Sequence, residues 1–98
     1  MKIAQRHHYE GDDWWKWSMW IQASKPELNA IENVTWHLHP TFSPTEVEID
    51  DRSSKFALET SGWGNFLVRV TITLKDGSKE RLSQELELSY PDGSLAED

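Results

Sequence analysis

The chain contains no cysteine among its 98 residues, so disulfide bonds and thiolate metal sites are excluded. The lack of thiols suits a reducing compartment, and we expect an intracellular, cytoplasmic protein. No apolar run approaches the roughly 18–20 residues that a membrane-spanning helix needs. Residues 1–11 also lack the apolar core of a secretory signal. We therefore expect neither membrane insertion nor a signal peptide.

Basic side chains are outnumbered: ten Lys and Arg stand against seventeen Asp and Glu, which gives a net charge of −7. This balance argues against direct binding to the phosphates of a nucleic acid. It favours a basic peptide, or a partner without charge. The sequence itself does not indicate self-association, and we expect a monomer.

Motifs that carry catalysis are also missing. The sequence has no phosphate-binding glycine loop and no HExxH, CxxC or GxSxG pattern. Ser, His and Asp occur, but their spacing does not suggest a nucleophile with its base. We therefore expect a binding module without enzymatic activity, and without a cofactor or a bound metal.

What the chain does contain is aromatic surface. Hydrophobic residues make up only 37%, but six Trp, three Phe and two Tyr add much area that can be buried. The length suits one domain with a modest core. We expect a flexible segment at 1–13 with solvated His7 and His8, a domain at 14–90, and a polar tail or linker at 91–98.

Apolar and polar residues alternate with a period of two along most of the chain, which is typical of half-buried strands. The alternation predicts strands at 14–22, 32–39, 45–50, 55–60, 65–75 and 79–89. Ser24 and Glu27 form a capping-box pattern for one helical turn near 26–30. Asp76-Gly77 indicates a type I′ hairpin turn. The predicted fold is an all-β sandwich.

The alternation also assigns faces. We expect the core to include Trp15, Trp17, Trp36, Phe56 and Val70. Trp14 and Trp20 then point outward, and two explanations stay open: loops cover them near a sandwich edge, or they form a surface for a partner.

His37 and His39 share the outward face of one predicted strand. Two such histidines could bind a metal, but the spacing suggests no third ligand. We expect both to act as hydrogen-bonding residues.

Two turns with large aromatic residues dominate the sequence: WHLHPTF at 36–42 and SGWGNF at 61–66. Exposed turns rarely present large aromatic side chains unless something packs on them. The two turns are therefore interpreted as two sides of one site.

This pair of motifs resembles the YEATS domain, and the opening WWKWSMWI resembles that family's first strand. The resemblance covers about residues 14–88 and is closer to prokaryotic members. It implies an immunoglobulin-like antiparallel β-sandwich. It also implies a reader that recognises acetyl- or crotonyl-type lysine in a peptide through an aromatic slot between two loops.

The resemblance further implies roles for individual residues. His39 would brace the first loop, the Thr41 hydroxyl would bond the acyl amide, and Phe42 and Trp63 would form the two aromatic walls. The Trp63 backbone N–H would meet the acyl carbonyl, and Gly64 would leave the far end open. The full ligand-binding set expected in this way is His39, Thr41, Phe42, Gly62, Trp63, Gly64, Asn65 and Phe66.

The chain departs from eukaryotic readers at Pro40, which removes a backbone donor and stiffens the turn. One alternative is that Phe42 and Trp63 simply stack on each other and close the end of the sandwich. In that case the protein would be an immunoglobulin-like interaction or structural module of a larger assembly. It would dock through Trp14 and Trp20 or through an edge strand.

Overall fold

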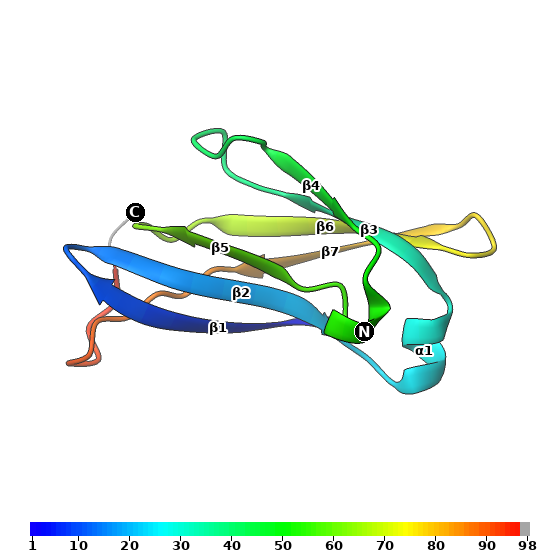
Figure 1. Ribbon diagram of the computed structural model, residues 1–98, viewed down its shortest axis with the longest axis horizontal. Helices are drawn as coiled ribbons and strands as arrows, with labels where there is room; N and C mark the ends of the chain where they lie inside the picture. The colour runs from blue at the N-terminus through cyan, green and yellow to red at the C-terminus, as the bar shows by residue number, and fades with distance from the viewer. Residues whose placement is uncertain (97–98) are drawn as a thin grey trace.

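The alternating segments form strands that pack as a two-layer sandwich (Figure 1), and the computed structural model describes residues 1–96. In chain order the elements are β1 (Lys2–Gly11), β2 (Trp14–Gln22), α1 (Lys25–Asn29), β3 (Ile31–His37), β4 (Glu46–Ile49), the 3-10 turn η1 (Arg52–Ser54), β5 (Leu58–Gly62), β6 (Leu67–Leu74) and β7 (Lys79–Glu85).

The strands form two antiparallel sheets with the orders β1-β2-β5 and β4-β3-β6-β7. The predicted all-β, immunoglobulin-like sandwich is therefore confirmed. The six predicted strands correspond to β2–β7, and β2 has the predicted bounds. The short helix α1 is also where the capping-box pattern indicates it. Within residues 1–96 no helix is long and apolar enough to cross a membrane.

The prediction of a flexible segment at 1–13 is wrong, because residues 2–11 form strand β1. This strand pairs with β2 from Lys2 opposite Gln22 to Gly11 opposite Trp14. Its sequence hides the strand because Ile3 is its only fully buried apolar residue. The rest of β1 is held by polar contacts to the C-terminal part of the chain, which the next paragraph describes.

Gln5 and His7 make these polar contacts. The Gln5 amide donates to the carbonyl of Glu85 (2.9 Å) and accepts from the N–H of Glu87 (3.0 Å). The ring Nε2 of His7 lies 2.9 Å from the Ser89 hydroxyl. His7 is therefore half-buried and bonded, and the prediction that it is solvated is wrong; His8 is exposed.

The predicted type I′ turn at Asp76-Gly77 is wrong in type. Only Gly77 has a positive φ there (91°), and its N–H donates to the Leu74 carbonyl (3.0 Å). A closed turn followed by a left-handed glycine is typical of three-residue hairpin loops. Two successive positive φ values occur instead at Asp12 and Asp13 (55° and 57°), between β1 and β2. Asp tolerates this region better than most residues.

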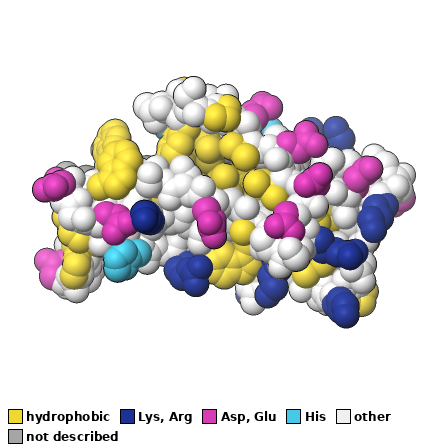
Figure 2. Space-filling view, in the orientation of Figure 1, with side chains coloured by type: hydrophobic (Ala, Val, Ile, Leu, Met, Phe, Trp, Pro, Cys, Tyr) yellow, Lys and Arg dark blue, Asp and Glu magenta, His cyan; other side chains and the backbone are white. Residues whose placement is uncertain are grey.

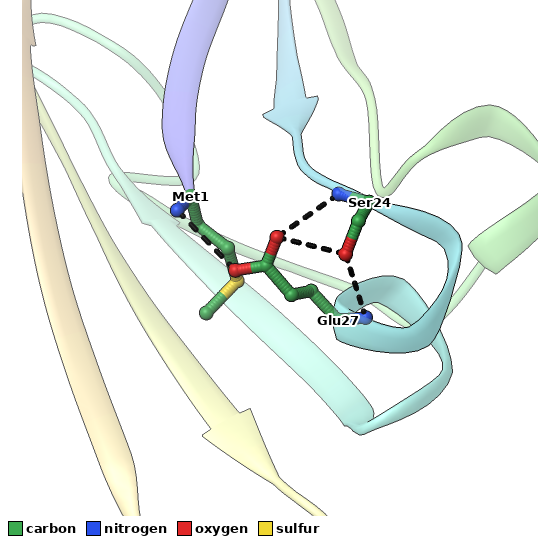
Figure 3. Close-up of polar contacts among 3 residues, drawn as sticks. All are labelled: Met1, Ser24 and Glu27. Carbon is green, nitrogen blue, oxygen red and sulfur yellow. Dashed lines mark hydrogen bonds and ion pairs between the residues drawn. The ribbon is translucent and has the colours of Figure 1, made fainter.

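The first turn of α1 is fixed by the predicted capping box (Figure 3). The Glu27 N–H donates to the Ser24 hydroxyl oxygen (3.3 Å), and the Ser24 N–H donates to Glu27 Oε1 (3.0 Å). The amino group of Met1 lies 3.5 Å from Glu27 Oε2. The hydrogen bonds from the Ser24 backbone and hydroxyl, followed by the positive amino terminus, hold the pKa of the Glu27 carboxyl below its usual value.

The space between the sheets is filled by aromatic and aliphatic side chains. All five residues expected in the core are buried: Trp15, Trp17, Trp36, Phe56 and Val70. Two of the tryptophans also satisfy their polar atom, because Trp36 Nε1 donates to the Phe56 carbonyl (3.0 Å) and Trp15 Nε1 donates to the Ser89 carbonyl (2.8 Å). Burial of such large rings makes the core of a small domain strong.

Part of the predicted polar tail at 91–98 is folded. Ser89 forms a bridge with Leu95, the Ala96 N–H donates to the Leu88 carbonyl (2.8 Å), and Ala96 is buried. Residues 97 and 98 lie outside the described residues. The chain thus folds back on itself after β7 and places its last described residues beside the 63–66 loop.

Candidate functional site

A pocket of about 330 Å³ opens at one end of the sandwich. It lies where the β3–β4 loop, the end of β5 and the β5–β6 loop meet. All eight residues of the predicted ligand-binding set line this pocket. Three further residues that the sequence analysis did not include also line it: Trp14, Ser43 and Ser61. The structure therefore brings the two aromatic turns together at one place.

The first side of the pocket is the β3–β4 loop. Its base is closed by the Leu38 N–H, which donates to the Thr45 carbonyl (2.8 Å). At the tip, the Phe42 N–H donates to the His39 carbonyl (2.9 Å), so His39 to Phe42 form a tight turn with Pro40 inside it. Proline fits this turn because it presets φ and needs no backbone partner.

His39 holds this turn through its side chain. Its ring Nδ1 accepts the N–H of Thr41 (3.2 Å) and lies 3.0 Å from the Thr41 hydroxyl. Because a backbone N–H can only donate, Nδ1 is an acceptor, and the hydroxyl must donate its own hydrogen to it. The lone pairs of the Thr41 oxygen are then left for a donor from outside the protein. Both side chains are exposed at the pocket mouth.

The floor of the pocket is a cluster of rings around Phe66. The Phe66 ring centroid lies 5.4 Å from that of Phe42, 5.8 Å from that of His39 and 6.0 Å from that of Trp17. Trp17 also meets Phe42 at 6.2 Å with an interplanar angle of 81°. The contact of Phe66 with Phe42 is tilted and the other three are edge-to-face, a geometry that aromatic pairs favour beyond area burial. Phe42 is therefore a pocket wall that is also anchored to the core.

Phe42 packs closely on Gly62. A Cβ at Gly62 would lie 3.4 Å from Phe42 Cζ and 3.6 Å from Trp17 Nε1. A larger side chain would push into Phe42, so glycine lets the ring approach the end of β5 closely. The role of Gly62 that the structure supports is to shape the pocket.

Trp63 forms the opposite wall and is free of other rings. Its side chain is 56% exposed, and within residues 1–96 it makes no ring–ring contact. Phe42 and Trp63 therefore do not stack on each other to close the sandwich. A tryptophan that is this exposed marks a surface that gains by being covered.

Trp14 lies beside Trp63 because of strand register. Trp15 pairs with Gly62 across β2 and β5, so the preceding Trp14 and the following Trp63 are neighbours at the same end. Trp14 is 43% exposed and lines the pocket. The sequence indicated only that Trp14 points outward. The pairing of β2 with β5, which is distant in sequence, decides where it points.

Trp20, the other outward tryptophan, is not part of the pocket. It is half-buried, and the guanidinium of Arg6 lies 5.9 Å from its ring centroid. This is a cation–π distance. Arg6 on β1 thus covers Trp20 on β2, so a side chain of the neighbouring strand covers Trp20 where one explanation expected a loop.

Asn65 lines the pocket, but its amide already has backbone partners. The side-chain Nδ2 donates to the Ala96 carbonyl (3.0 Å), and Oδ1 accepts the Leu88 N–H (2.9 Å). Asn65 therefore ties the 63–66 loop to the folded C-terminal segment. Its contribution to the site is to position Trp63 and Gly64.

The histidines of β3 and its loop make hydrogen bonds, as the sequence predicts. His37 Nε2 lies 2.9 Å from the Thr71 hydroxyl, and its Nδ1 lies 3.6 Å from a Glu46 carboxylate oxygen. In the described part of the chain no group of three or more His, Cys, Asp or Glu is arranged to hold a metal ion. The carboxyls with a lowered pKa do not line the pocket, and each is bonded to a nearby serine; they are Glu27, Asp51, Asp76 and Asp92.

A model of the prokaryotic YEATS domain matches residues 15–87, about three quarters of the chain. The chain belongs to this family. The resemblance carried by the two aromatic turns is thereby confirmed, including its prokaryotic type.

Solved structures of the Yaf9 YEATS domain have the same fold as this YEATS domain. One, of the domain recognising an H3K122suc peptide, has a TM-score of 0.69 and 17% identity, over 88% of this chain and 68% of that chain. Another, bound to H3K27ac, has a TM-score of 0.70 and 14% identity, over 96% and 73%. A third, titled as the structure of the Yaf9 domain, has a TM-score of 0.70 and 17% identity, over 98% and 76%. At such identities the likeness establishes the fold.

Proposed function

We propose that this prokaryotic YEATS domain is a non-enzymatic module that binds an acylated lysine of a peptide or protein in the pocket between Phe42 and Trp63. The observation that carries the proposal is an open, aromatic-lined pocket with a hydroxyl acceptor at its mouth. Family membership and the acylated histone peptides named in the Yaf9 structures support the class of ligand. The net charge of −7 favours a basic segment around the modified lysine.

The polar part of the ligand is an amide, which needs one acceptor and one donor. The Thr41 oxygen is the acceptor, because its own hydrogen is committed to His39 Nδ1. The backbone N–H of Trp63 is the proposed donor to the acyl carbonyl. The flat amide then lies between the rings of Phe42 and Trp63.

Energetic estimates fit a binding module of moderate affinity. Each aromatic contact adds about 0.5–1.5 kcal/mol beyond area burial, and each hydrogen bond adds about 0.5–1.5 kcal/mol net. A micromolar complex requires about 8 kcal/mol, which such contacts and the buried area can supply. The volume of about 330 Å³ suits the head of one acylated side chain.

Selectivity for the acylated form follows from charge. An unmodified lysine would bring an ammonium group into an apolar pocket, where none of the lining residues is an acid that could pair with it. Acylation removes that charge. We expect a large difference in affinity between acylated and unmodified lysine, even though the affinity for the acylated form is moderate.

The other end of the pocket sets the acyl chain that fits. Gly64 leaves space there, and Trp14 adds a third ring beside Trp63. A planar crotonyl group gains ring contact over an acetyl group, so we propose acetyl- and crotonyl-type ligands with a preference for crotonyl.

The alternative is an interaction scaffold that docks through Trp14 and Trp20 or through an edge strand, and the two tryptophans do not favour it. Trp14 belongs to the pocket, and Trp20 is covered by Arg6. The two side chains therefore do not form one exposed surface.

Calorimetric titration with crotonyl-, acetyl- and unmodified-lysine versions of one basic peptide tests the proposal. We expect saturable binding of the acylated peptides and none of the unmodified one. Trp20→Ala is the matched control, since it removes an outward tryptophan that does not line the pocket. Equal binding of all three peptides, or binding of none, would contradict the proposal.

A further inference from the structure

Strand β5 is an edge strand that leads directly into the pocket. It pairs with β2 on one side only, and its last two residues, Ser61 and Gly62, line the pocket. Within residues 1–96 no backbone hydrogen bond joins β5 to a segment other than its ladder with β2. Figure 1 shows β5 at the edge of its sheet, beside β2. Its free side therefore presents unpaired N–H and C=O groups beside the proposed ligand.

Of the two edges of the β1-β2-β5 sheet, that of β1 is covered and that of β5 is not. Proteins blunt exposed edges with proline, lysine, bulges or covering segments. β1 is fastened to the C-terminal part of the chain by the hydrogen bonds of Gln5 and His7. β5 contains no proline and no lysine, and its register with β2 is continuous. A strand edge without these features is suited to pairing with an added chain.

The direction of side chains decides what an added strand would do. Residues directly opposite each other in neighbouring strands point to the same face of the sheet. The face of Gly62 is the one where a Cβ would meet Phe42 Cζ at 3.4 Å. A residue of an added strand opposite Gly62 thus sends its side chain toward Phe42, and the residues next to it point to the outer face.

We infer that the acylated segment binds as an extended strand along the free edge of β5, with its acyl-lysine opposite Gly62 and entering the pocket. This inference rests on the proposed function and adds the mode of binding to it. The chain that pairs with the β5 edge is the one that carries the acyl-lysine. Only that chain places a side chain in the pocket next to this edge.

The same register predicts a preference in the ligand sequence. Glu59 lies three positions before Gly62 on the outer face, is exposed, and makes no ion pair within residues 1–96. A ligand residue three positions from the acyl-lysine, on one side of it, would lie opposite Glu59. Opposite charges across a strand pair are favourable, so that ligand residue is basic. Figure 2 shows acidic side chains mixed with basic ones in this view, and hydrophobic surface between β5 and β4.

The first test compares two crotonyl-lysine probes. One is crotonyl-lysine with its ends capped as simple amides, and the other is an alanine–serine peptide with crotonyl-lysine at its centre. The long peptide is expected to bind about tenfold or more tightly, because it adds several backbone hydrogen bonds. Ester replacement of single amides in it should weaken binding about twofold to tenfold at every second position. The intervening amides are internal controls, because in an added strand they point to solvent.

The second test uses Glu59, which does not line the pocket. Peptides with one lysine three positions before or after the crotonyl-lysine should differ in affinity by about twofold to fivefold. Glu59→Gln should remove this difference and Glu59→Lys should reverse it, while binding of the capped crotonyl-lysine stays unchanged. Glu48→Gln, which removes an exposed acid from the edge strand β4, is the matched control and should change nothing.

Three results separate the possible failures. If the capped crotonyl-lysine binds but the long peptide binds no better, or the ester effects do not alternate, the strand-addition inference is overturned and the proposed function stands. If neither probe binds, both fail. If the protein forms dimers that compete with the long peptide and not with the capped residue, a second copy occupies the β5 edge and the inference is overturned.

Discussion

The tryptophans of the core and those of the pocket end show how one residue type serves two purposes in this domain. Trp15 and Trp36 are fully buried between the sheets, and each donates its indole N–H to a backbone carbonyl. Trp14 and Trp63, only one or a few residues from buried positions, are 43% and 56% exposed at the pocket. In the core a ring is covered by the protein itself. At the pocket the covering surface is left for a ligand, so the same truncation should damage stability in one place and binding in the other.

Truncation in the core should give the largest effect. Trp36→Ala leaves a cavity between the sheets and an unpaired Phe56 carbonyl, and is expected to lower the free energy of unfolding by about 3–5 kcal/mol. This approaches the whole stability of a small domain. Denaturant unfolding followed by tryptophan fluorescence measures it. A midpoint close to that of the wild type would show that the comparison between core and pocket is wrong.

Truncation at the pocket should leave stability nearly intact. Trp63→Ala removes a side chain that packs on no other ring, so the unfolding free energy should change by no more than about 0.5 kcal/mol. Crotonyl-lysine binding should fall at least about tenfold, since one aromatic wall is lost. Unfolding and calorimetry on the same sample separate the two effects.

Phe42→Ala sharpens the comparison because Phe42 belongs to both regions. Its ring contacts Trp17 and Phe66 in the floor while it lines the pocket. We expect loss of binding together with a loss of stability of about 1–3 kcal/mol, less than for a fully buried ring. If Phe42→Ala were as harmless to stability as Trp63→Ala, the ring cluster would not anchor this wall.

A smaller effect is expected at Thr41. Thr41→Val keeps the shape and removes the acceptor for the ligand amide, so binding should weaken by about 1 kcal/mol, roughly fivefold. Thr41→Ser keeps the hydroxyl and should retain most of the affinity. Equal affinities for the two variants in a calorimetric titration would mean that this oxygen does not bind the acyl amide.

The smallest expected effect is a pH-dependent change in stability at Glu27, which does not line the pocket. The pKa of the Glu27 carboxyl is lowered in the folded state, chiefly by its hydrogen bonds with Ser24, so its charged form favours folding. This contribution is present above the pKa of the unfolded chain and is lost as the pH falls through the folded pKa. Glu27→Gln should therefore be slightly less stable than the wild type at neutral pH and equal to it in acid. Denaturant unfolding at several pH values checks this, and a difference that grows in acid would contradict it.

The sequence predicts most of this fold because most strands alternate cleanly. β2 carries four buried residues at every second position, and its bounds are predicted correctly. β1 is missed because, besides its pairing with β2, it is held by the polar side chains of Gln5 and His7, whose partners Glu85 and Ser89 lie at the other end of the chain. Polar contacts over such separations leave no periodic signal.

The site is predictable to the extent that it is local. The two aromatic turns can be read from the sequence, and all eight expected residues line one pocket. The place of Trp14 depends on the register of β2 with β5, and the occupied amide of Asn65 depends on Leu88 and Ala96. Neither follows from residues near in sequence. The type of the hairpin turn at Gly77 likewise depends on which carbonyl accepts its N–H, and a dipeptide does not determine that.

The central claim is that an acyl-lysine binds between the loop of Thr41 and the loop of Trp63. Backbone amide NMR during titration with end-capped crotonyl-lysine tests it most directly, because this probe has no flanking residues. We expect saturable shifts at Thr41, Phe42, Trp63 and Gly64, with little change at Trp20 and Arg6. No saturable shift, or shifts that gather around Trp20 instead, would contradict it.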